Sequence, residues 1–462
     1  MKITPSIPKG TRDFDASTLY KRQYIINAIK AVYDLYGFEP IETPTMEKLQ
    51  ILNGKYGDEG DQLLFKVLNN GDFLQKAEPS LLEKKDSASV APAISSKGLR
   101  YDLTVPFARY VAQHRNEISF PFKRYQVQSV WRADRPQKGR YREFLQCDAD
   151  VIGTDSLIAE SEFLQIYDAV FRRLGLHDAV VKLNNRKILS GLAESIGAAD
   201  LFMQLTIAID KLDKIGMKAV ADELSENGFT TDQIDEITDI LNLQEQEGNI
   251  LPLIAERLQK SELAQQGVRE LTEIVENNNE LSLNHDRFTI DITLARGLSY
   301  YTGTIFEAVV PDSGIGSISG GGRYDDLTEL FGFPNVSGVG ISFGIDRIFD
   351  VIDHLNKWPT YLAEKKSPTR VLVTYMNTEV KGKVVDFMEK LRANGIASEM
   401  YLEPAKLGKQ FKYANDKGIP HVVVIGPEEI EKGEYQVKFM KSGQQQSLPP
   451  AYIINALKPK QR

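Results

Sequence analysis

The sequence is poor in the residues that build disulfide frameworks and metal centres. Cys147 is the only cysteine among 462 residues, so no intrachain disulfide can form, which fits a reducing compartment. We expect it to pack as a small hydrophobic side chain. The five histidines show no pair at the spacing of zinc ligands, so we expect no zinc site. No Gly-x-x-x-x-Gly-Lys-Ser/Thr segment occurs, which excludes a P-loop.

Long apolar runs are also missing. No stretch approaches the roughly 18 apolar residues that suggest a membrane span, and the first residues form no apolar signal segment. Hydrophobic residues make up 42% and charged residues 26% of the chain, an ordinary globular composition. We therefore expect a cytoplasmic protein, and the length predicts two to four domains.

Charge is unevenly distributed beneath a net value of −8. Residues 371–462 hold 14 Lys and Arg against 10 Asp and Glu, a balance of +4. Residues 121–145 hold seven basic and two acidic side chains, a balance of +5. Local basic surface on an acidic body favours a selective polyanionic partner, although charge also varies along any chain.

Hydrophobic periodicity predicts the elements of the first half. The spacing of apolar residues predicts a helix over 18–36 that Gly37 ends. Residues 101–114 predict a short strand that turns into a helix after Pro106. Alternation over 121–152 predicts a long β-hairpin, and 156–174 predicts a second amphipathic helix.

Composition changes near residue 186. From there to about 282 the chain predicts several helices, among them 218–227, 231–242 and 252–276, and strand character returns at Phe288–Leu294 and Thr304–Val310. Residues 186–282 are therefore interpreted as a helical insertion into a sheet-based domain.

The segment 355–369, with its prolines and lysines, predicts a linker. The alternating elements that follow it are a strand at Val371–Tyr375, a helix at Val380–Asn394, a strand at Ala397–Tyr401, a helix at Gly408–Lys417 and a strand at His421–Ile425. Such alternation predicts a small α/β domain. The expected division is a catalytic domain of residues 1–185 and 283–355, an insertion of 186–282, a linker of 356–370 and a C-terminal domain of 371–462.

A basic segment runs from Trp131 to Phe144, and five of its side chains are Arg or Lys. Guanidinium groups donate paired hydrogen bonds in one plane, which suits phosphate and carboxylate oxygens. Strand alternation places Arg140, Arg142 and Phe144 on one face, where cations could meet a phosphate and the ring a base. A solvated basic hairpin is the alternative interpretation.

The same face continues into Gln146, Asp148 and Asp150. Inward-pointing carboxylates and amides are costly unless they find partners, and a small ligand with an amino group would supply them. Exposure of these side chains to solvent is the alternative.

Four more segments carry polar residues in suggestive patterns. In Arg100–Pro106, Asp102 and Thr104 alternate onto one face. The other three are an Arg-Gly turn with a Tyr pair at Ala295–Gly303, a glycine-rich loop at Gly320–Asp325, and a strand leading into a helix at Gly338–Arg347. Each segment alone is weak evidence for a binding site, because glycine runs and packed aromatic rings also occur in ordinary turns.

Together these segments resemble the class II aminoacyl-tRNA synthetases, and specifically the histidyl-tRNA synthetase family. Motif 1 resembles Tyr36–Pro44, motif 2 resembles Arg132–Phe144, and motif 3 resembles Gly340–Arg347. Ala295–Tyr301 and Gly320–Asp325 resemble segments specific to the histidyl family, and the C-terminal stretch with Gly408–Ala414 is similar to its anticodon-binding domain. The resemblance covers about residues 8 to 460.

The resemblance implies an α/β protein in which an α+β catalytic domain is built on an antiparallel sheet flanked by helices. It further implies a helical insertion, a C-terminal α/β anticodon-binding domain and a homodimer. The implied reaction joins histidine to its tRNA through a histidyl-adenylate, with ATP, accompanying Mg²⁺ and no zinc.

The resemblance also implies roles for individual residues. Arg132 and Arg296 are the expected catalytic residues, on either side of the α-phosphate. The expected histidine-binding residues are Asp102, Leu103, Thr104, Arg132, Gln146, Asp150, Arg296, Tyr300 and Tyr301. The expected ATP-binding residues are Arg132, Asp134, Arg140, Phe144 and Arg347, and no metal ligands are expected.

Two positions depart from the family pattern: Ser299 stands where Asp is usual, and Asp326 where Gly is common. Ser299 bears on how Arg296 is oriented. Three alternatives remain open: a non-charging regulatory paralogue, another amino-acid specificity within the class, and an amino-acid sensor. The paralogue usually lacks the C-terminal domain and the motif arginines, both of which this sequence has.

Overall fold

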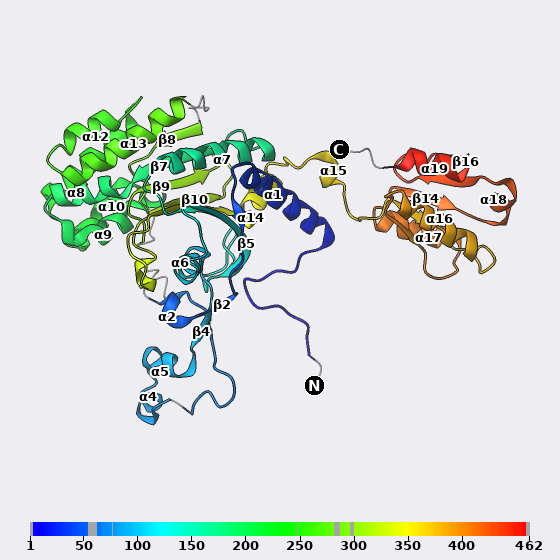
Figure 1. Ribbon diagram of the computed structural model, residues 1–462, viewed down its shortest axis with the longest axis horizontal. Coiled ribbons are helices and arrows are strands. Elements are labelled where there is room, and N and C mark those ends of the chain that lie inside the picture. The colour runs from blue at the N-terminus through cyan, green and yellow to red at the C-terminus, as the bar shows by residue number, and fades with distance from the viewer. Residues whose placement is uncertain are drawn as a thin grey trace. The chain divides into compact units, whose positions relative to one another are not determined.

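The chain divides into two compact units in this computed structural model (Figure 1). The first unit comprises Met1–Asp13 and Arg22–Lys357, and the second comprises Phe14–Lys21 and Trp358–Arg462. The structure describes residues 3–53, 62–75, 77–246, 248–280, 287–295 and 300–458.

An eight-stranded sheet forms the centre of the first unit, in the order β1-β5-β6-β11-β10-β9-β7-β8. Its strands are β1 (Glu39–Pro40), β5 (Phe122–Trp131), β6 (Glu143–Ile152), β11 (Gly338–Gly344), β10 (Ser319–Tyr324), β9 (Thr304–Val309), β7 (Val180–Asn185) and β8 (Phe288–Ile290). All inner pairs are antiparallel, and only the edge pairs β1–β5 and β7–β8 are parallel. The expected antiparallel sheet and the β-hairpin over 121–152 are confirmed.

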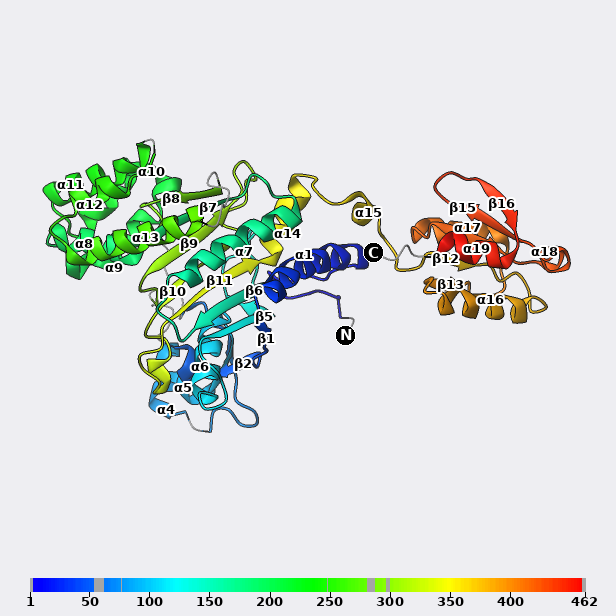
Figure 2. The ribbon, with the colours of Figure 1, turned by 45° about the horizontal axis from the view of Figure 1, so that its top comes forward.

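Three helices cover one face of this sheet: α1 (Ala16–Leu35), α7 (Ile158–Leu174) and α14 (Ile345–His354) (Figure 2). Tyr33 and Tyr167 both pack against Phe343 of β11, with ring centroids 6.4 and 5.3 Å apart. Cys147 lies on this face, completely buried as expected, and its carbonyl accepts a hydrogen bond from the Tyr33 hydroxyl. The apolar half of the alternating pattern in β6 therefore faces the helices.

The other face carries α6 (Thr104–Gln113) and a small sheet with short helices beyond it (Figure 1). These are β2 (Met46–Lys48), β4 (Lys97–Leu99), β3 (Lys66–Val67), α2 (Leu49–Leu52), α4 (Pro79–Glu83) and α5 (Ser87–Ile94). The predicted strand before Pro106 is wrong, because α6 already begins at Thr104. The Asp102 carboxylate accepts the Val105 N–H at 3.1 Å, and Pro106 fits the first turn, where its missing N–H costs no hydrogen bond.

Among the described residues between β7 and β8, six α-helices gather at that end of the sheet (Figure 2). They are α8 (Arg186–Ser195), α9 (Phe202–Ile209), α10 (Leu212–Glu226), α11 (Thr231–Leu241), α12 (Leu251–Arg257) and α13 (Glu262–Glu280). The single helix expected over 252–276 is wrong: Ser261 accepts the Ala264 N–H at 3.2 Å and starts a new helix. These helices group with the first unit, and their status as a separate domain stays a prediction.

The second unit holds a five-stranded sheet in the order β13-β12-β14-β15-β16. Its elements are β12 (Val371–Val373), α16 (Lys381–Ala393), β13 (Ser398–Met400), α17 (Leu407–Asp416), β14 (His421–Val424), α18 (Pro427–Lys432), β15 (Tyr435–Phe439), β16 (Gln445–Leu448) and α19 (Pro450–Leu457). The expected α/β arrangement is confirmed, and β15 and β16 add a hairpin that was not predicted. The short helix α15 (Thr360–Ala363) lies within the predicted linker.

None of the helices in the described part of the chain combines the length and hydropathy that crossing a membrane requires.

Candidate active site

A polar face runs across the middle of the large sheet, opposite the face that α1 and α7 cover. The antiparallel register of β5 and β6 pairs Arg124 with Asp150, Gln126 with Asp148, and Gln128 with Gln146. Because side chains alternate along a strand, these six polar groups share one face. Sequence alternation had placed Gln146, Asp148 and Asp150 together, and the structure confirms that arrangement.

Beside these polar groups, glycines of β10 and β11 leave part of the sheet face without side chains. Gly340 of β11 lies opposite Asp150 on β6 and opposite Gly322 on β10. A Cβ added at Gly340 would lie 2.1 Å from the Asp150 Oδ1 atom, so no larger residue fits without moving that carboxylate. The glycine-rich segment at 320–325 was predicted as a loop, which is wrong: Ser319–Tyr324 is the buried strand β10. Its glycines serve close approach rather than a turn.

A pocket opens over this bare region of the sheet. It is lined by Thr104, Asp148, Asp150, Tyr300, Tyr301, Gly320, Gly321, Gly322, Tyr324, Gly340, Ile341 and Ser342. Four predicted histidine-binding residues therefore meet there: Thr104, Asp150, Tyr300 and Tyr301. The rings of Tyr300 and Tyr301 lie 4.8 Å apart, and Tyr300 meets Tyr324 edge-on at 6.4 Å.

Asp150 is held at the floor of the pocket by two partners that the sequence did not single out. It is 2% exposed, its Oδ2 atom lies 2.6 Å from an Arg124 guanidinium nitrogen, and the Tyr324 hydroxyl donates to Oδ1 at 2.6 Å. Burial raises the pKa of Asp150, while Arg124 and the Tyr324 hydrogen bond oppose that rise. Arg124 stabilises the charge of Asp150, which leaves the carboxylate able to accept a hydrogen bond from a ligand.

Gln146 and Asp148 are the other two polar side chains of β6 on this face of the sheet. The Gln146 amide donates to the Ser342 hydroxyl at 2.7 Å, but its carbonyl oxygen has no hydrogen-bond partner among the described residues. Asp148 is 2% exposed, and its Oδ1 atom is likewise without a hydrogen-bond partner there. Burial raises the pKa of Asp148 to about 7, although Arg124 counteracts part of the rise.

The start of α6 brings Asp102, Leu103 and Thr104 to the pocket edge. The Tyr300 hydroxyl donates to the Asp102 carboxylate at 3.5 Å, which links this edge to the tyrosine pair. Thr104 lines the pocket directly. The Leu103 side chain is completely buried in the core, so only its backbone can contribute to a site.

Arg132 lies just past the end of β5, between two aromatic rings. Its guanidinium carbon is 4.2 Å from the Tyr101 ring centroid and 5.2 Å from that of Phe144. Its Nε atom donates to the Tyr101 carbonyl at 3.2 Å. The stacking orients the guanidinium group, and one ring is that of Phe144, a predicted ATP-binding residue.

Arg140 and Asp134 form an ion pair in the loop between β5 and β6, with Nε and Oδ2 3.2 Å apart. Arg140 is half exposed and Asp134 is buried. The expectation that Arg140 and Arg142 belong to a regular strand is wrong, because β6 begins at Glu143. The backbone N–H of Arg142 instead donates to the Gly10 carbonyl at 2.9 Å.

Arg347 lies in the first turn of α14. It donates to the carbonyls of Gly139 at 2.9 Å and Ser317 at 2.6 Å, so α14 is fastened to the β5–β6 loop. The neighbouring Asp346 pairs with Arg12 and Arg22. These contacts bring the predicted motif 2 and motif 3 segments together.

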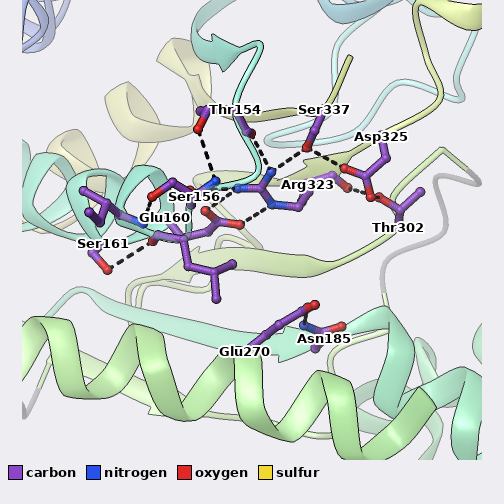
Figure 3. A network of polar contacts seen from close by, with 12 residues as sticks. Thr154, Ser156, Glu160, Ser161, Asn185, Glu270, Thr302, Arg323, Asp325 and Ser337 are labelled. Atoms are coloured by element: carbon purple, nitrogen blue, oxygen red, sulfur yellow. Dashed lines mark hydrogen bonds and ion pairs between the residues drawn. The ribbon is translucent and has the colours of Figure 1, made fainter. Parts of the chain in front are cut away.

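A buried network of polar contacts is centred on Arg323, as Figure 3 shows. Arg323, next to Tyr324 on β10, donates to both Glu160 carboxylate oxygens at 2.6 and 2.7 Å and to the Ser337 hydroxyl at 2.6 Å. Ser337 donates to Asp325, which also accepts from Thr302 at 2.6 Å. Thr302 directly follows the tyrosine pair, so the network positions that segment.

Several expectations concern residues that the structure leaves undescribed. Arg296 and Ser299 both lie outside the described residues, so the role of Arg296 stays a prediction. Within the described ranges, no three His, Cys, Asp or Glu side chains are grouped to hold a metal ion.

An antiparallel sheet with helices on one face and a polar, glycine-floored pocket on the other is the catalytic architecture of the class II aminoacyl-tRNA synthetases. A family model described as Histidyl-tRNA synthetase matches residues 95–348, and one described as Anticodon binding domain matches residues 370–460. The chain belongs to the histidyl-tRNA synthetase family. The resemblance and the fold class predicted from the sequence are thus confirmed.

Similar proteins cover nearly the whole chain. The Histidine--tRNA ligase of Porphyromonas gingivalis is 52% identical over 98% of this chain and 99% of its own length. That of Christiangramia forsetii is 50% identical over 99% and 100%. The crystal structure of histidyl-tRNA synthetase from Nostoc sp. PCC 7120 superposes with a TM-score of 0.80 at 31% identity, covering 99% of both chains.

Proposed function

We propose that this chain is a ligase that attaches L-histidine to its tRNA with ATP, through a histidyl-adenylate intermediate. Family membership and relatives named Histidine--tRNA ligase over nearly the full length support this activity. The observation that carries it is the pocket in which Asp150, held by Arg124 and Tyr324, faces a space shared with Tyr301.

The pocket suits the two ends of histidine. An imidazole offers one N–H donor and one nitrogen acceptor, which Asp150 and the Tyr301 hydroxyl can match. Asp102, Thr104 and Gln146 would surround the α-amino end, with Tyr300 and the backbone of Leu103 completing that edge. Arg132 would bridge the histidine carboxylate and the α-phosphate, and Arg296 would approach the phosphate from the other side.

ATP would lie beside the start of β6 and the first turn of α14. Phe144 and Arg347 would hold the adenine between them, because an aromatic ring and a guanidinium group both stack on bases. Arg140, steadied by Asp134, would hold the outer phosphates. We expect Mg²⁺ to accompany ATP as part of the substrate, and we expect no zinc.

In the first step the histidine carboxylate attacks the α-phosphorus, and pyrophosphate leaves. The protein supplies positioning and positive charge, because the histidine carboxylate is itself the nucleophile in this step. Arg132 is half-buried and stacked, so its charge is held in place before the reaction begins. In the second step a hydroxyl of the terminal ribose of the tRNA attacks the histidyl carbonyl, so the histidyl group passes to the ribose and AMP leaves.

The second unit combines a positive charge balance with lysine-flanked aromatic rings, and both features suit a surface that binds single-stranded RNA. Residues 371–462 carry a balance of +4. Three partly buried aromatic side chains each have a lysine ammonium over the ring: Lys409 over Tyr401 at 5.8 Å, Lys417 over Tyr413 at 4.7 Å and Lys438 over Phe411 at 4.3 Å. Aromatic rings that stack on bases, edged with lysines for phosphates, would read the anticodon loop.

We further propose a cytoplasmic homodimer, with the motif 1 region around Tyr36–Pro44 at the subunit interface. Sedimentation of the purified chain at micromolar concentration would show one species of twice the chain mass. A monomer that still charges tRNA would contradict the dimer.

Amino-acid-dependent exchange of pyrophosphate into ATP tests the proposed function. The exchange should depend on histidine and on no other amino acid, and histidine should appear on tRNA when tRNA is added. Exchange with another amino acid would overturn the specificity. A regulatory or sensing paralogue would bind histidine without any exchange, and that outcome would overturn the charging activity.

A further inference from the structure

Asp148 is a buried carboxylate that lines the pocket. Its side chain is 2% exposed, and its Oδ1 atom has no hydrogen-bond partner within the described residues. A buried carboxylate oxygen that lacks a partner costs free energy, because water no longer solvates it. The pocket therefore contains a carboxylate oxygen to which a ligand could donate a hydrogen bond.

The side chains nearest in the sheet do not supply that donor. Gln126 lies opposite Asp148, but its amide donates to the Thr43 hydroxyl at 2.8 Å and to Gln128. Arg124 is paired with Asp150 at 2.6 Å and donates to the Gln126 side-chain carbonyl at 3.3 Å, and none of its nitrogens makes a hydrogen bond to Asp148. On the other side, β11 presents only Ser342, whose hydrogen bond to the Asp148 carboxylate leaves Oδ1 unpartnered.

The charges around Asp148 favour a cation in the pocket. Asp150 is balanced by Arg124, whereas the nearby Asp102 adds a second negative charge at the pocket edge. Arg100 is also close enough to interact with Asp148, but its guanidinium group donates to the carbonyls of Thr43 and Ser129. Burial and the two acidic neighbours raise the pKa of Asp148 to about 7, against the attraction of Arg124.

Among the groups of the proposed substrate, the α-ammonium is the cation at neutral pH, since an imidazole is largely neutral there. The second unpartnered acceptor, the Gln146 carbonyl, lies two residues before Asp148 on the same strand face. An ammonium group has three donors and can satisfy both oxygens. We propose that Asp148, together with Gln146, binds the α-ammonium group of the amino-acid substrate, while Asp150 faces the imidazole; this rests on the proposed histidine site.

The variant Asp148→Asn keeps the side-chain shape and removes the charge. Binding is measured by calorimetry with two ligands: histidinol, which has the amino group, and 4-(3-hydroxypropyl)imidazole, which lacks it. Losing a hydrogen bond to a charged group should weaken histidinol binding about 10- to 100-fold. Binding of the analogue without the amino group should change less than about twofold. Asp235→Asn, on the exposed face of α11, is the matched control and should change neither affinity.

An equal loss for both ligands would overturn the inference, because Asp148 would then act on the ring or on the fold. Unchanged binding of both would also overturn it. In both cases histidine-dependent exchange by the unaltered chain would still support the proposed function. Failure of the unaltered chain to bind histidinol would overturn both.

A second measurement compares proton release by the unaltered chain and by Asp148→Asn. An ammonium beside Asp148 favours the ionised carboxylate, so binding near pH 6.5 should release a proton from it. Binding enthalpies of both chains in buffers of different ionisation enthalpy give the number of protons released. Histidinol should release more protons from the unaltered chain than from Asp148→Asn, because the ring of the ligand contributes equally to both. Equal release would overturn the inference.

Discussion

The carboxylate of Asp346 accepts the backbone N–H of Leu145 at 2.9 Å and so joins the first turn of α14 to the start of β6. Leu145 follows Phe144, and Asp346 precedes Arg347, the two residues proposed to hold adenine. Asp346 also pairs with Arg12 and the buried Arg22, so its orientation is fixed from the opposite side. One carboxylate thus determines the spacing of both halves of the proposed adenine site.

Replacing Asp346 by Ala should raise the KM for ATP about 10-fold in the exchange reaction, because the adenine-holding residues lose their shared anchor. The KM for histidine should change little. The variant should also lose about 3–5 kcal/mol of stability, because Arg22 is left buried without its partner. Asp346→Asn can keep the Leu145 hydrogen bond while losing the ion pairs. A KM for ATP raised equally in both variants would contradict the anchoring role.

Arg124→Met should shift the pH profile of kcat/KM for histidine. Arg124 opposes the rise in the pKa of Asp150 that burial causes, so removing it raises that pKa further. Asp150 is then protonated over a wider range, and the acid limb of the profile should move to higher pH. Exchange kinetics between pH 5.5 and 8.5 measure the shift. Arg172→Met, at an exposed position of α7, is the control; an unmoved acid limb in Arg124→Met would refute the prediction.

Asp148→Asn should stabilise the first unit at high pH. Folding raises the pKa of Asp148 from 3.8 to about 7, so the native state retains a proton that the unfolded chain loses between those values. Stability from this group therefore falls as pH rises from about 4 to 7 and stays low above that range, whereas Asn cannot ionise. The gain at pH 8 should be on the order of 2–4 kcal/mol at most, and small at pH 4. Thermal unfolding at both values checks it, and a gain that is independent of pH would contradict it.

Gly340→Ala should weaken histidine binding while leaving the fold intact. The new methyl group would lie 2.1 Å from the Asp150 Oδ1 atom, so the carboxylate must move away from its ligand-facing position. We expect at least a roughly 10-fold rise in the KM for histidine with circular dichroism unchanged. Gly382→Ala, where nothing lies within 4 Å of the added methyl group, is the control. Normal histidine kinetics in Gly340→Ala would show that the pocket lies elsewhere.

Lys409→Ala, Lys417→Ala and Lys438→Ala together should weaken tRNA charging while leaving histidine-dependent exchange intact. Each lysine that contacts a phosphate contributes close to one unit to the slope of log affinity against log salt. Filter binding of tRNA at 50 to 200 mM salt should therefore give a shallower slope for the triple variant. Lys432→Ala, at an exposed position of α18, is the control. An unchanged slope would place the tRNA surface elsewhere.

The long hairpin and the α/β order of the C-terminal unit could be predicted because their patterns are local and long. Ten residues of alternation in β6 have few alternative explanations. The short alternation of Asp102 and Thr104 does have one, because Asp102 accepts a backbone N–H from the first turn of α6 instead of lying in a strand. The glycines of β10 were misread because glycine serves both turns and close-packed strands.

Arg124 was missed for a different reason. Its significance depends on the register of β5 against β6, which places it opposite Asp150, 26 residues further along the chain. In the sequence it is one more basic residue in a basic stretch. Asp148 could be placed on the right face, but its lack of a partner depends on where Gln126 and Ser342 direct their hydrogen bonds. Alternation predicts the face of a strand and not the partners on it.

Asp150 is held by an ion pair with Arg124 and a hydrogen bond from Tyr324. These two contacts limit how this pocket can be redesigned for unnatural amino acids. Mutating Asp150 alone to accept a larger or neutral ring would leave Arg124 buried without its counter-charge and Tyr324 without its acceptor. Libraries aimed at histidine analogues should therefore vary these three positions together, with an uncharged residue at Arg124 whenever Asp150 loses its charge.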